Sequence, residues 1–168
     1  MLITETERLS FLKYQKEDLD IYQQLMGNPK VAKYITGQPP TKEQSKSRFD
    51  YILSLNQKHE FFGFFKVIDK KTDTAIGLAK LVQTDENQAE LGYAVEPGHW
   101  KQGFGAEITK GLINLTKSTT ALTSLLAIVQ PQNQVSIHLL QKFGFQFSHP
   151  IPDPKGVSQI VSAYVLTI

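Results

Sequence analysis

A glycine-rich turn in the middle of the chain carries the clearest chemical signal. Residues 89–95 alternate like a short strand, and from residue 106 onward apolar residues recur at helical spacing. The turn between them, residues 96–105, contains Gly103 and Gly105. Glycines let backbone N–H groups approach a ligand closely, and the first turn of a helix adds unpaired donors and a positive dipole end. This succession of strand, turn and helix therefore predicts an anion site.

Two common nucleotide motifs do not fit the turn. The dinucleotide fingerprint G-x-G-x-x-G needs Gly or Ala three places after its second glycine, where this chain has Ile108. A phosphate loop of the form G-x-x-x-x-G-K-[ST] would need Ser or Thr directly after its lysine. Here Lys110 is followed by Gly111. Neither nucleotide motif therefore explains the predicted anion site.

Composition sets broad limits on the function. The 168 residues suit one domain with a core, and a hydrophobic content of 40% argues against a disordered chain. The net charge of +2 is too small to indicate a nucleic-acid surface. Because there is no cysteine, disulfides, thiolate catalysis and cysteine metal sites are excluded, and the four histidines show no metal-ligand spacing. No apolar run reaches the ~18 residues of a membrane span, and the N-terminus does not resemble a signal peptide, so we expect a soluble cytoplasmic protein without a metal.

The hydrophobic periodicity predicts one domain over residues 1–168 with the element order β-αα-βββ-α-β-α-ββ. Thr41 and Gln44 form a capping box, and Asn133 is a natural N-cap. We expect strands at residues 9–14, 60–69, 75–83, 89–95, 124–130, 145–149 and 159–167, and helices at residues 16–27, 41–57, 106–118 and 133–143. Residues 31–40 are expected to form a loop with room for one helical turn, and residues 149–156 a proline-rich loop.

These elements predict an α/β (α+β) fold with a mixed central sheet of six to seven strands. Short polar turns make the three middle strands an antiparallel meander. Strand 124–130 can be reached only through a helical crossover, so we expect it to run parallel to strand 89–95. Parallel neighbours that part at their carboxyl ends leave a crevice for a ligand.

The order of elements and several motifs resemble the GNAT superfamily of N-acetyltransferases, in particular its RimJ/RimL-type branch. Residues 100–105 are similar to the coenzyme A pyrophosphate motif Q/R-x-x-G-x-G/A, with Trp100 in the first place, as in the W-G-K-G-Y-A of that branch. Further matches are TERLSFLKY at residues 6–14, I-G at 76–77, E-L-G-Y at 90–93 and N-x-x-S-x-x-L-L-x-K-x-G-F at 133–145. The resemblance covers nearly the whole chain and implies an acetyl-CoA-dependent N-acetyltransferase.

The resemblance also implies how coenzyme A is held. Backbone amides of the glycine turn would cradle the pyrophosphate, and the pantetheine arm would lie along the end of strand 89–95. A bulge in that strand would direct an N–H near Ala94 or Val95 at the thioester carbonyl, as an oxyanion donor. Asn133 would contact the pantetheine region besides capping its helix. The expected coenzyme A contacts are Ala94, Val95, Lys101, Gln102, Gly103, Phe104, Gly105, Ala106, Asn133 and Ser136.

Ser136 and Glu90 are the expected catalytic residues. In the resembling branch the matching serine lies near the thioester sulfur and can donate a proton to it. Many other GNAT enzymes use a tyrosine a few residues further along, where this chain has Leu139 and Leu140. Glu90 begins the strand that leads to the thioester and can serve as base through a water, or it is an ordinary surface carboxylate. Trp100 either walls the acceptor cleft or covers the glycine turn.

The reaction implied is direct attack of a primary amine on acetyl-CoA in a ternary complex, without an acyl-enzyme. Neutralising a lysine amine with a pKa near ~10.4 costs over ~4 kcal/mol at pH 7, against about 1–1.5 kcal/mol for an α-amine, so a peptide or protein N-terminus is favoured. The expected acceptor segments, residues 27–41 and 149–159, lack the clustered carboxylates that a polycation needs. A small-molecule amine (antibiotic or polyamine) and a non-catalytic coenzyme A-binding module are the alternatives. We expect a monomer or homodimer with neither nucleic-acid nor membrane partners.

Overall fold

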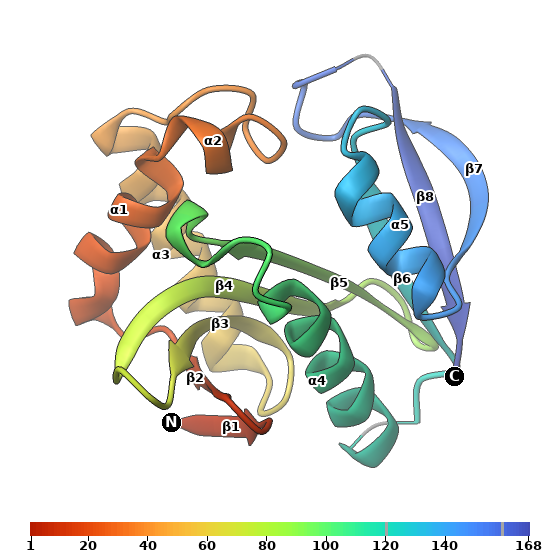
Figure 1. Cartoon of the computed structure of the whole chain (residues 1–168), viewed down its shortest axis with the longest axis horizontal. Helices are drawn as coiled ribbons and strands as arrows, with labels where there is room; N and C mark the ends of the chain where they lie inside the picture. The colour runs from red at the N-terminus through yellow and green to blue at the C-terminus, as the bar shows by residue number, and fades with distance from the viewer. Residues whose placement is uncertain (120, 159) are drawn as a thin grey trace.

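One mixed sheet of eight strands, in the order β1-β2-β3-β4-β5-β6-β8-β7, forms the centre of the computed structural model (Figure 1). The structure describes residues 1–119, 121–158 and 160–168. In chain order the elements are β1 (Leu2–Glu5), β2 (Leu9–Lys13), η1 (Lys16–Asp18), α1 (Leu19–Gly27), α2 (Pro29–Ala32), α3 (Lys42–Lys58), β3 (Gly63–Asp69), β4 (Thr74–Gln83), β5 (Gln88–Val95), η2 (Pro97–His99), α4 (Phe104–Thr119), β6 (Ser124–Val129), α5 (Gln134–Lys142), β7 (Gln146–Pro152) and β8 (Ile160–Thr167).

Helices cover both faces of the sheet, and Figure 1 shows α4 and α5 in front of it and α3 behind. Alternate residues of a strand point to opposite faces, so one strand contributes to two cores. On β5, Leu91 and Val95 belong to the cluster that packs under α4 and α5, whereas Ala94 packs with residues of α1 and α3. Which helix layer a β5 side chain meets therefore depends on its odd or even position.

The sheet is antiparallel except at β5 and β6, which run parallel as the sequence predicts. These two strands pair only over Gln88–Ser124, Ala89–Leu125 and Glu90–Leu126. Beyond Glu90, β5 stays paired with β4 as far as Val95, while β6 follows β8. The two parallel strands therefore separate at their carboxyl ends, which is the crevice expected from the pattern.

Several element boundaries agree with the sequence prediction. Helix α3 begins after Thr41, whose hydroxyl accepts from the Gln44 N–H at 3.2 Å while the Gln44 side chain returns a bond to the Thr41 N–H. The single helical turn expected in the loop after α1 is α2. Asn133 caps α5, its Oδ1 accepting from the N–H of Ser136 at 3.3 Å. Gln159, predicted to begin the last strand, lies outside the described residues.

Other boundaries differ for identifiable reasons. The short strand β1 was not predicted, and it adds an eighth strand by pairing with β2. Strand β3 begins at Gly63 and not at the predicted residue 60. At the start of this strand, the side chain of Asn56 in α3 exchanges two hydrogen bonds with the backbone of Phe64. Strand β7 includes Pro150 and Pro152, which the sequence assigned to a loop. Prolines are tolerated there because β7 is an edge strand, where a missing N–H costs no ladder bond.

Candidate active site

The glycine turn, hereafter the phosphate loop (residues 96–105), directs unpaired backbone donors outward. Lys101 and Gly103 both have positive φ angles, 61° and 83°, and α4 begins at Phe104, two residues earlier than predicted. In the described chain, no protein acceptor takes a hydrogen bond from the N–H groups of residues 101–106. These donors, together with the N-terminus of a long helix, fit the pyrophosphate of coenzyme A.

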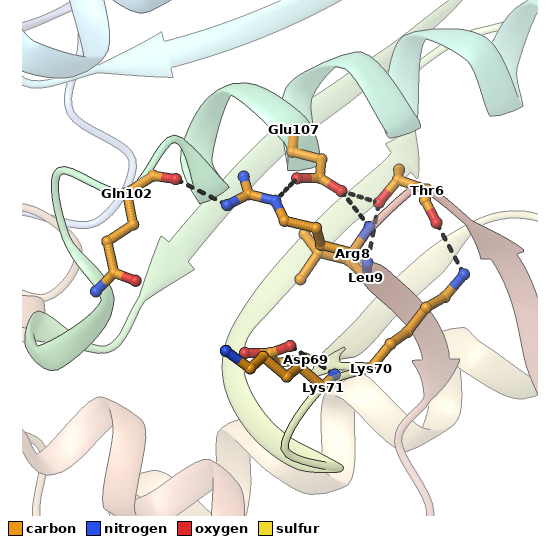
Figure 2. A network of polar contacts seen from close by, with 8 residues as sticks. All are labelled: Thr6, Arg8, Leu9, Asp69, Lys70, Lys71, Gln102 and Glu107. Carbon is orange, nitrogen blue, oxygen red and sulfur yellow. Dashed lines mark hydrogen bonds and ion pairs between the residues drawn. The ribbon is translucent and has the colours of Figure 1, made fainter.

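A side-chain network, hereafter the clamp (Thr6, Arg8 and Glu107), fixes the phosphate loop against the start of β2. Figure 2 shows Arg8 between Glu107 and Gln102: its Nε lies 2.6 Å from Glu107 Oε2, and its Nη1 donates to the Gln102 carbonyl at 3.0 Å. The guanidinium also stacks over the Phe104 ring at 4.3 Å. Burial alone would raise the pKa of Glu107, but hydrogen bonds from Thr6 and Arg8 outweigh it and lower that pKa. The clamp therefore holds a carboxylate and an arginine beside the loop.

Arg8 is a site residue that the sequence reasoning missed. It lies in the TERL motif quoted for the family resemblance, but nothing local indicates that it reaches a loop more than ninety residues away. A guanidinium this close to the phosphate loop adds positive charge where an anion would bind. In the sequence, Arg8 was visible only as one residue of the matching TERL motif, and no role was assigned to it.

A side chain at Gly105 would crowd Tyr93 of β5. A Cβ at this position would lie 3.1 Å from the ring of Tyr93, which is closer than normal side-chain packing allows. The space above Gly105 is therefore needed by Tyr93 of β5.

Tyr93 and Ser136 form a hydroxyl pair between β5 and α5. The Tyr93 hydroxyl lies 3.3 Å from Ser136 Oγ, and either group can be the donor. Burial raises the pKa of Tyr93, and the hydrogen bond with Ser136 opposes that shift only in part. Tyr93 therefore remains protonated across the neutral range, and its hydroxyl can donate a hydrogen bond. The sequence reasoning identified Ser136 and gave Tyr93 no role beyond its place in the alternating strand and in the E-L-G-Y match.

The backbone of β5 decides which amides face the separation from β6. The ladder between β4 and β5 runs through seven residue pairs without a register shift. At one end of it the Thr84 N–H donates to the Gln88 carbonyl, and at the other end the Glu96 N–H donates to the Ile76 carbonyl. In an antiparallel ladder, alternate residues direct both backbone groups to the same neighbour. Even-numbered residues therefore face β4, and Leu91, Tyr93 and Val95 face the separation from β6.

This geometry corrects two details of the predicted oxyanion donor. The expected bulge is absent from the β4–β5 register over residues 77–95. Ala94 directs its backbone toward β4, and its carbonyl oxygen lies against Gly77. Val95 faces the separation, but its carbonyl accepts a 2.7 Å bond from the indole of Trp100. Trp100 thus ties the phosphate loop to β5, and it does not line the cavity described next.

A cavity of about 470 Å³ crosses the sheet where β5 and β6 separate. On the α4/α5 side its walls include Tyr93, Asn133 and Ser136, hereafter the coenzyme end. On the side of α1–α3 its charged walls are Arg48, Lys80, Glu90 and Lys155, hereafter the acceptor end. The cavity therefore joins the two predicted catalytic residues, Ser136 and Glu90, across the sheet.

Glu90 is not an ordinary surface carboxylate. Its side chain is 18% exposed, and Oε2 lies 2.5 Å from the ammonium of Lys80 on β4. Oε1 has no hydrogen-bond partner among the described residues. The carboxylate thus has one oxygen paired and the other available to the cavity.

Two loops meet over the acceptor end. The loop between β7 and β8 is organised by Asp153, whose carboxylate accepts from three backbone N–H groups and from Gln130 Nε2 at 3.0 Å. Burial would raise the pKa of Asp153, but these donors outweigh it and lower that pKa. Val157 of this loop packs against Gly37, which follows α2. The two segments predicted to select the acceptor therefore touch, and they close one side of the cavity.

Within residues 1–119, 121–158 and 160–168, no three His, Cys, Asp or Glu side chains lie close enough to hold a metal ion. In the same residues, no helix is long and apolar enough to cross a membrane.

Comparison with known proteins agrees with this geometry. Residues 8–146 match the family model described as the acetyltransferase (GNAT) domain. The N-acetyltransferase p20 of Bacillus licheniformis, itself uncharacterized, is 30% identical over 167 residues, covering 97% of this chain and 93% of p20. The apo structure of RimL, a ribosomal L7/L12 α-N-protein acetyltransferase, superposes with a TM-score of 0.84 at 13% identity over 100% of this chain and 94% of RimL. The spermidine N-acetyltransferase of Vibrio cholerae gives 0.79 at 17% identity, over 96% of each chain.

Proposed function

The chain belongs to the GNAT family of acetyltransferases, which use acetyl-CoA, and we propose that it acetylates a primary α-amine by direct attack in a ternary complex. The preferred acceptor is the N-terminus of a peptide or a small molecule with a comparable amine. The observation that carries this proposal is the cavity through the sheet. It joins a hydroxyl pair at the coenzyme end to a carboxylate at the acceptor end.

The coenzyme A contacts in this proposal are those expected from the sequence, with Arg8 added and Ala94 removed. Unpaired N–H groups of residues 101–106 would donate to the pyrophosphate, at about 1.5–3 kcal/mol for each bond to a charged acceptor. Arg8 supports them with its charge and by fixing the loop through Gln102. Asn133 and Ser136 line the cavity next to β5 and would contact the pantetheine arm.

Bound acetyl-CoA supplies the acetyl group as a thioester. The N–H of Val95 is directed into the separation between β5 and β6, and we assign it the role of donor to the carbonyl oxygen there. Tyr93, kept protonated by its raised pKa, holds the proton for the departing sulfur, and Ser136 orients that hydroxyl or relays its proton. We thus propose the pair, rather than Ser136 alone, as the acid.

Glu90 is the proposed base. Its free Oε1 can accept a proton from the amine directly or through one water, and Lys80 holds the carboxylate in place through Oε2. A single carboxylate is a modest base for a lysine amine, whose neutralisation costs over ~4 kcal/mol at pH 7. An α-amine, which needs about 1–1.5 kcal/mol, suits this site better.

The test is a coupled assay of thiol release from acetyl-CoA with a panel of amines. The panel contains peptides with free N-termini, the same peptides N-blocked but containing lysine, spermidine and an aminoglycoside. We expect the free N-terminal peptides to turn over fastest. Faster turnover of spermidine or of the aminoglycoside would reject the α-amine preference. Slow thioester hydrolysis with no transfer to any amine would identify a non-catalytic coenzyme A-binding module instead.

Direct attack is tested separately with acetyl-labelled acetyl-CoA. We expect no acetyl group bound covalently to the protein when the amine is omitted, because the chain has no cysteine to carry it. A labelled acetyl-enzyme that forms and decays at the catalytic rate would replace the ternary mechanism with a two-step one.

A further inference from the structure

The acceptor end of the cavity has an uneven charge. Its ionised side chains are Arg48, Lys80 and Lys155 against Glu90, a net charge of +2. The remaining charged side chains of the sequence, 15 basic and 15 acidic, sum to zero. Since Lys80 is neutralised by Glu90 at 2.5 Å, Arg48 and Lys155 account for the excess.

Neither of these two cations forms an ion pair among the described residues. In the described chain, neither Arg48 nor the ammonium of Lys155 forms an ion pair or a side-chain hydrogen bond. They come from opposite sides of the cavity: Arg48 from α3, and Lys155 from the loop between β7 and β8. Two unpaired cations that converge from separate elements are arranged to bind an anion.

The position of Lys155 is set by the structure around it. Asp153 accepts from the Lys155 N–H at 2.9 Å and from two further amides of the loop, and Gln130 ties Asp153 to the end of β6. The pKa of Lys155 is lowered, first by burial of its ammonium against the cavity walls and then by the positive charge of Lys80. Glu90 and Asp153 oppose that shift and do not cancel it. Lys155 is exposed to solvent and also lines the cavity.

We infer that the acceptor is a primary amine that also carries an anionic group, a carboxylate or a phosphate, bound between Arg48 and Lys155 while its amine faces Glu90. This inference rests on the proposed function, since it names the substrate class for the same cavity. A polyamine would bring further positive charge to an end that already has an excess of it. An amine with an attached anion satisfies both the cations and the carboxylate.

Matched peptides test the inference with the amine held constant. Ala-Asp amide and Ala-Asn amide have similar α-amines and differ by one carboxylate, and Ala-phosphoserine amide and Ala-Ser amide differ by one phosphate. We expect kcat/KM for the anionic member of each pair to exceed that of the neutral member by about tenfold, as a charge-assisted hydrogen bond would produce. A ten-residue peptide beginning Ala-Asp distinguishes a small acidic amine from an acidic peptide N-terminus.

Substitutions of the two cations test whether they cause the preference for anionic peptides. Arg48→Gln and Lys155→Gln should each reduce, by about tenfold, the ratio of kcat/KM for the anionic peptide to kcat/KM for its neutral counterpart. Lys46→Gln is the matched control, because Lys46 lies on the same helix, is exposed, pairs with Asp50 at 2.8 Å and does not line the cavity. Circular dichroism and thermal unfolding would verify that each variant folds.

The possible outcomes distinguish a failure of the anionic-acceptor inference from a failure of the proposed acetyltransferase function. Equal kcat/KM within both pairs, with measurable turnover, would overturn the acidic acceptor and leave the acetyltransferase proposal standing. A discrimination that survives both Arg48→Gln and Lys155→Gln would also overturn it. If no peptide of either kind is acetylated while coenzyme A still binds, the proposed function itself fails.

Discussion

The two ends of the cavity are built in different ways. The coenzyme end combines Tyr93 of β5 with Asn133 and Ser136 at the start of α5, and Tyr93 also packs beside Gly105, in the continuous stretch formed by β5, the phosphate loop and α4. The acceptor end combines single side chains from α3, β4, β5 and the loop after β7. A contiguous motif can be read from the sequence, whereas a convergence of distant side chains cannot.

The largest effect is expected at the coenzyme end from Tyr93→Phe, which removes the hydroxyl and keeps the ring that packs under Gly105. We expect kcat to fall by about 10²–10³-fold, as is typical for loss of a general acid. Coenzyme A affinity, measured by calorimetry, should change little. Ser136→Ala should have a smaller effect on kcat. The reverse order would return the role of acid to Ser136.

The next effect is expected at the acceptor end from Glu90→Gln. It removes the proposed base and leaves Lys80 without its carboxylate, so we expect kcat to fall by about 10–10²-fold. Part of the loss should be recovered at higher pH, where more of the amine is neutral without help from a base. Measuring kcat from pH 7 to 9.5 for both proteins checks this. Parallel pH profiles would show that Glu90 does not act as the base.

A third variant, Arg8→Gln, should sharpen the division between the two ends. It breaks the ion pair with Glu107 and the bond to the Gln102 carbonyl. We expect KM for acetyl-CoA to rise about 5–10-fold, with KM for the amine nearly unchanged, because charged contacts to the phosphate loop are lost at one end only. Lys46→Gln again serves as control. An equal rise in both KM values would mean that the clamp supports the whole fold.

The smallest effect is expected from Asp153, and it depends on pH. Because its folded pKa is lowered, the ionised carboxylate contributes stability above the ordinary aspartate pKa of about 3.9, and this is lost as the pH falls through the lowered value. Asp153→Asn should therefore lower the free energy of unfolding at pH 6. The difference from the unmodified protein should disappear as the pH falls below about 4. Urea unfolding at several pH values measures this, and a difference that persists in acid would contradict it.

Much of the coenzyme end was predictable because its signals are local. A glycine-rich turn, an N-cap asparagine and an apolar period that changes from two to 3.6 are properties of adjacent residues. The parallel pairing of β5 and β6 also followed from the sequence, since a helical crossover leaves no other arrangement. These features were confirmed, and only boundaries moved, at the start of α4 and in β3 and β7.

What the sequence determined by itself is the family, the order of the elements after β1 and the position of the glycine-rich turn, because these depend on periodicity and on residues close together in the chain. The tertiary structure decided the rest. Three features of the site bring together residues more than forty positions apart in the chain: Tyr93 with Ser136, Arg8 with Glu107, and Arg48 with Lys155. No local pattern encodes such contacts. They arise only when the sheet aligns its strands and when alternate side chains are directed to opposite faces.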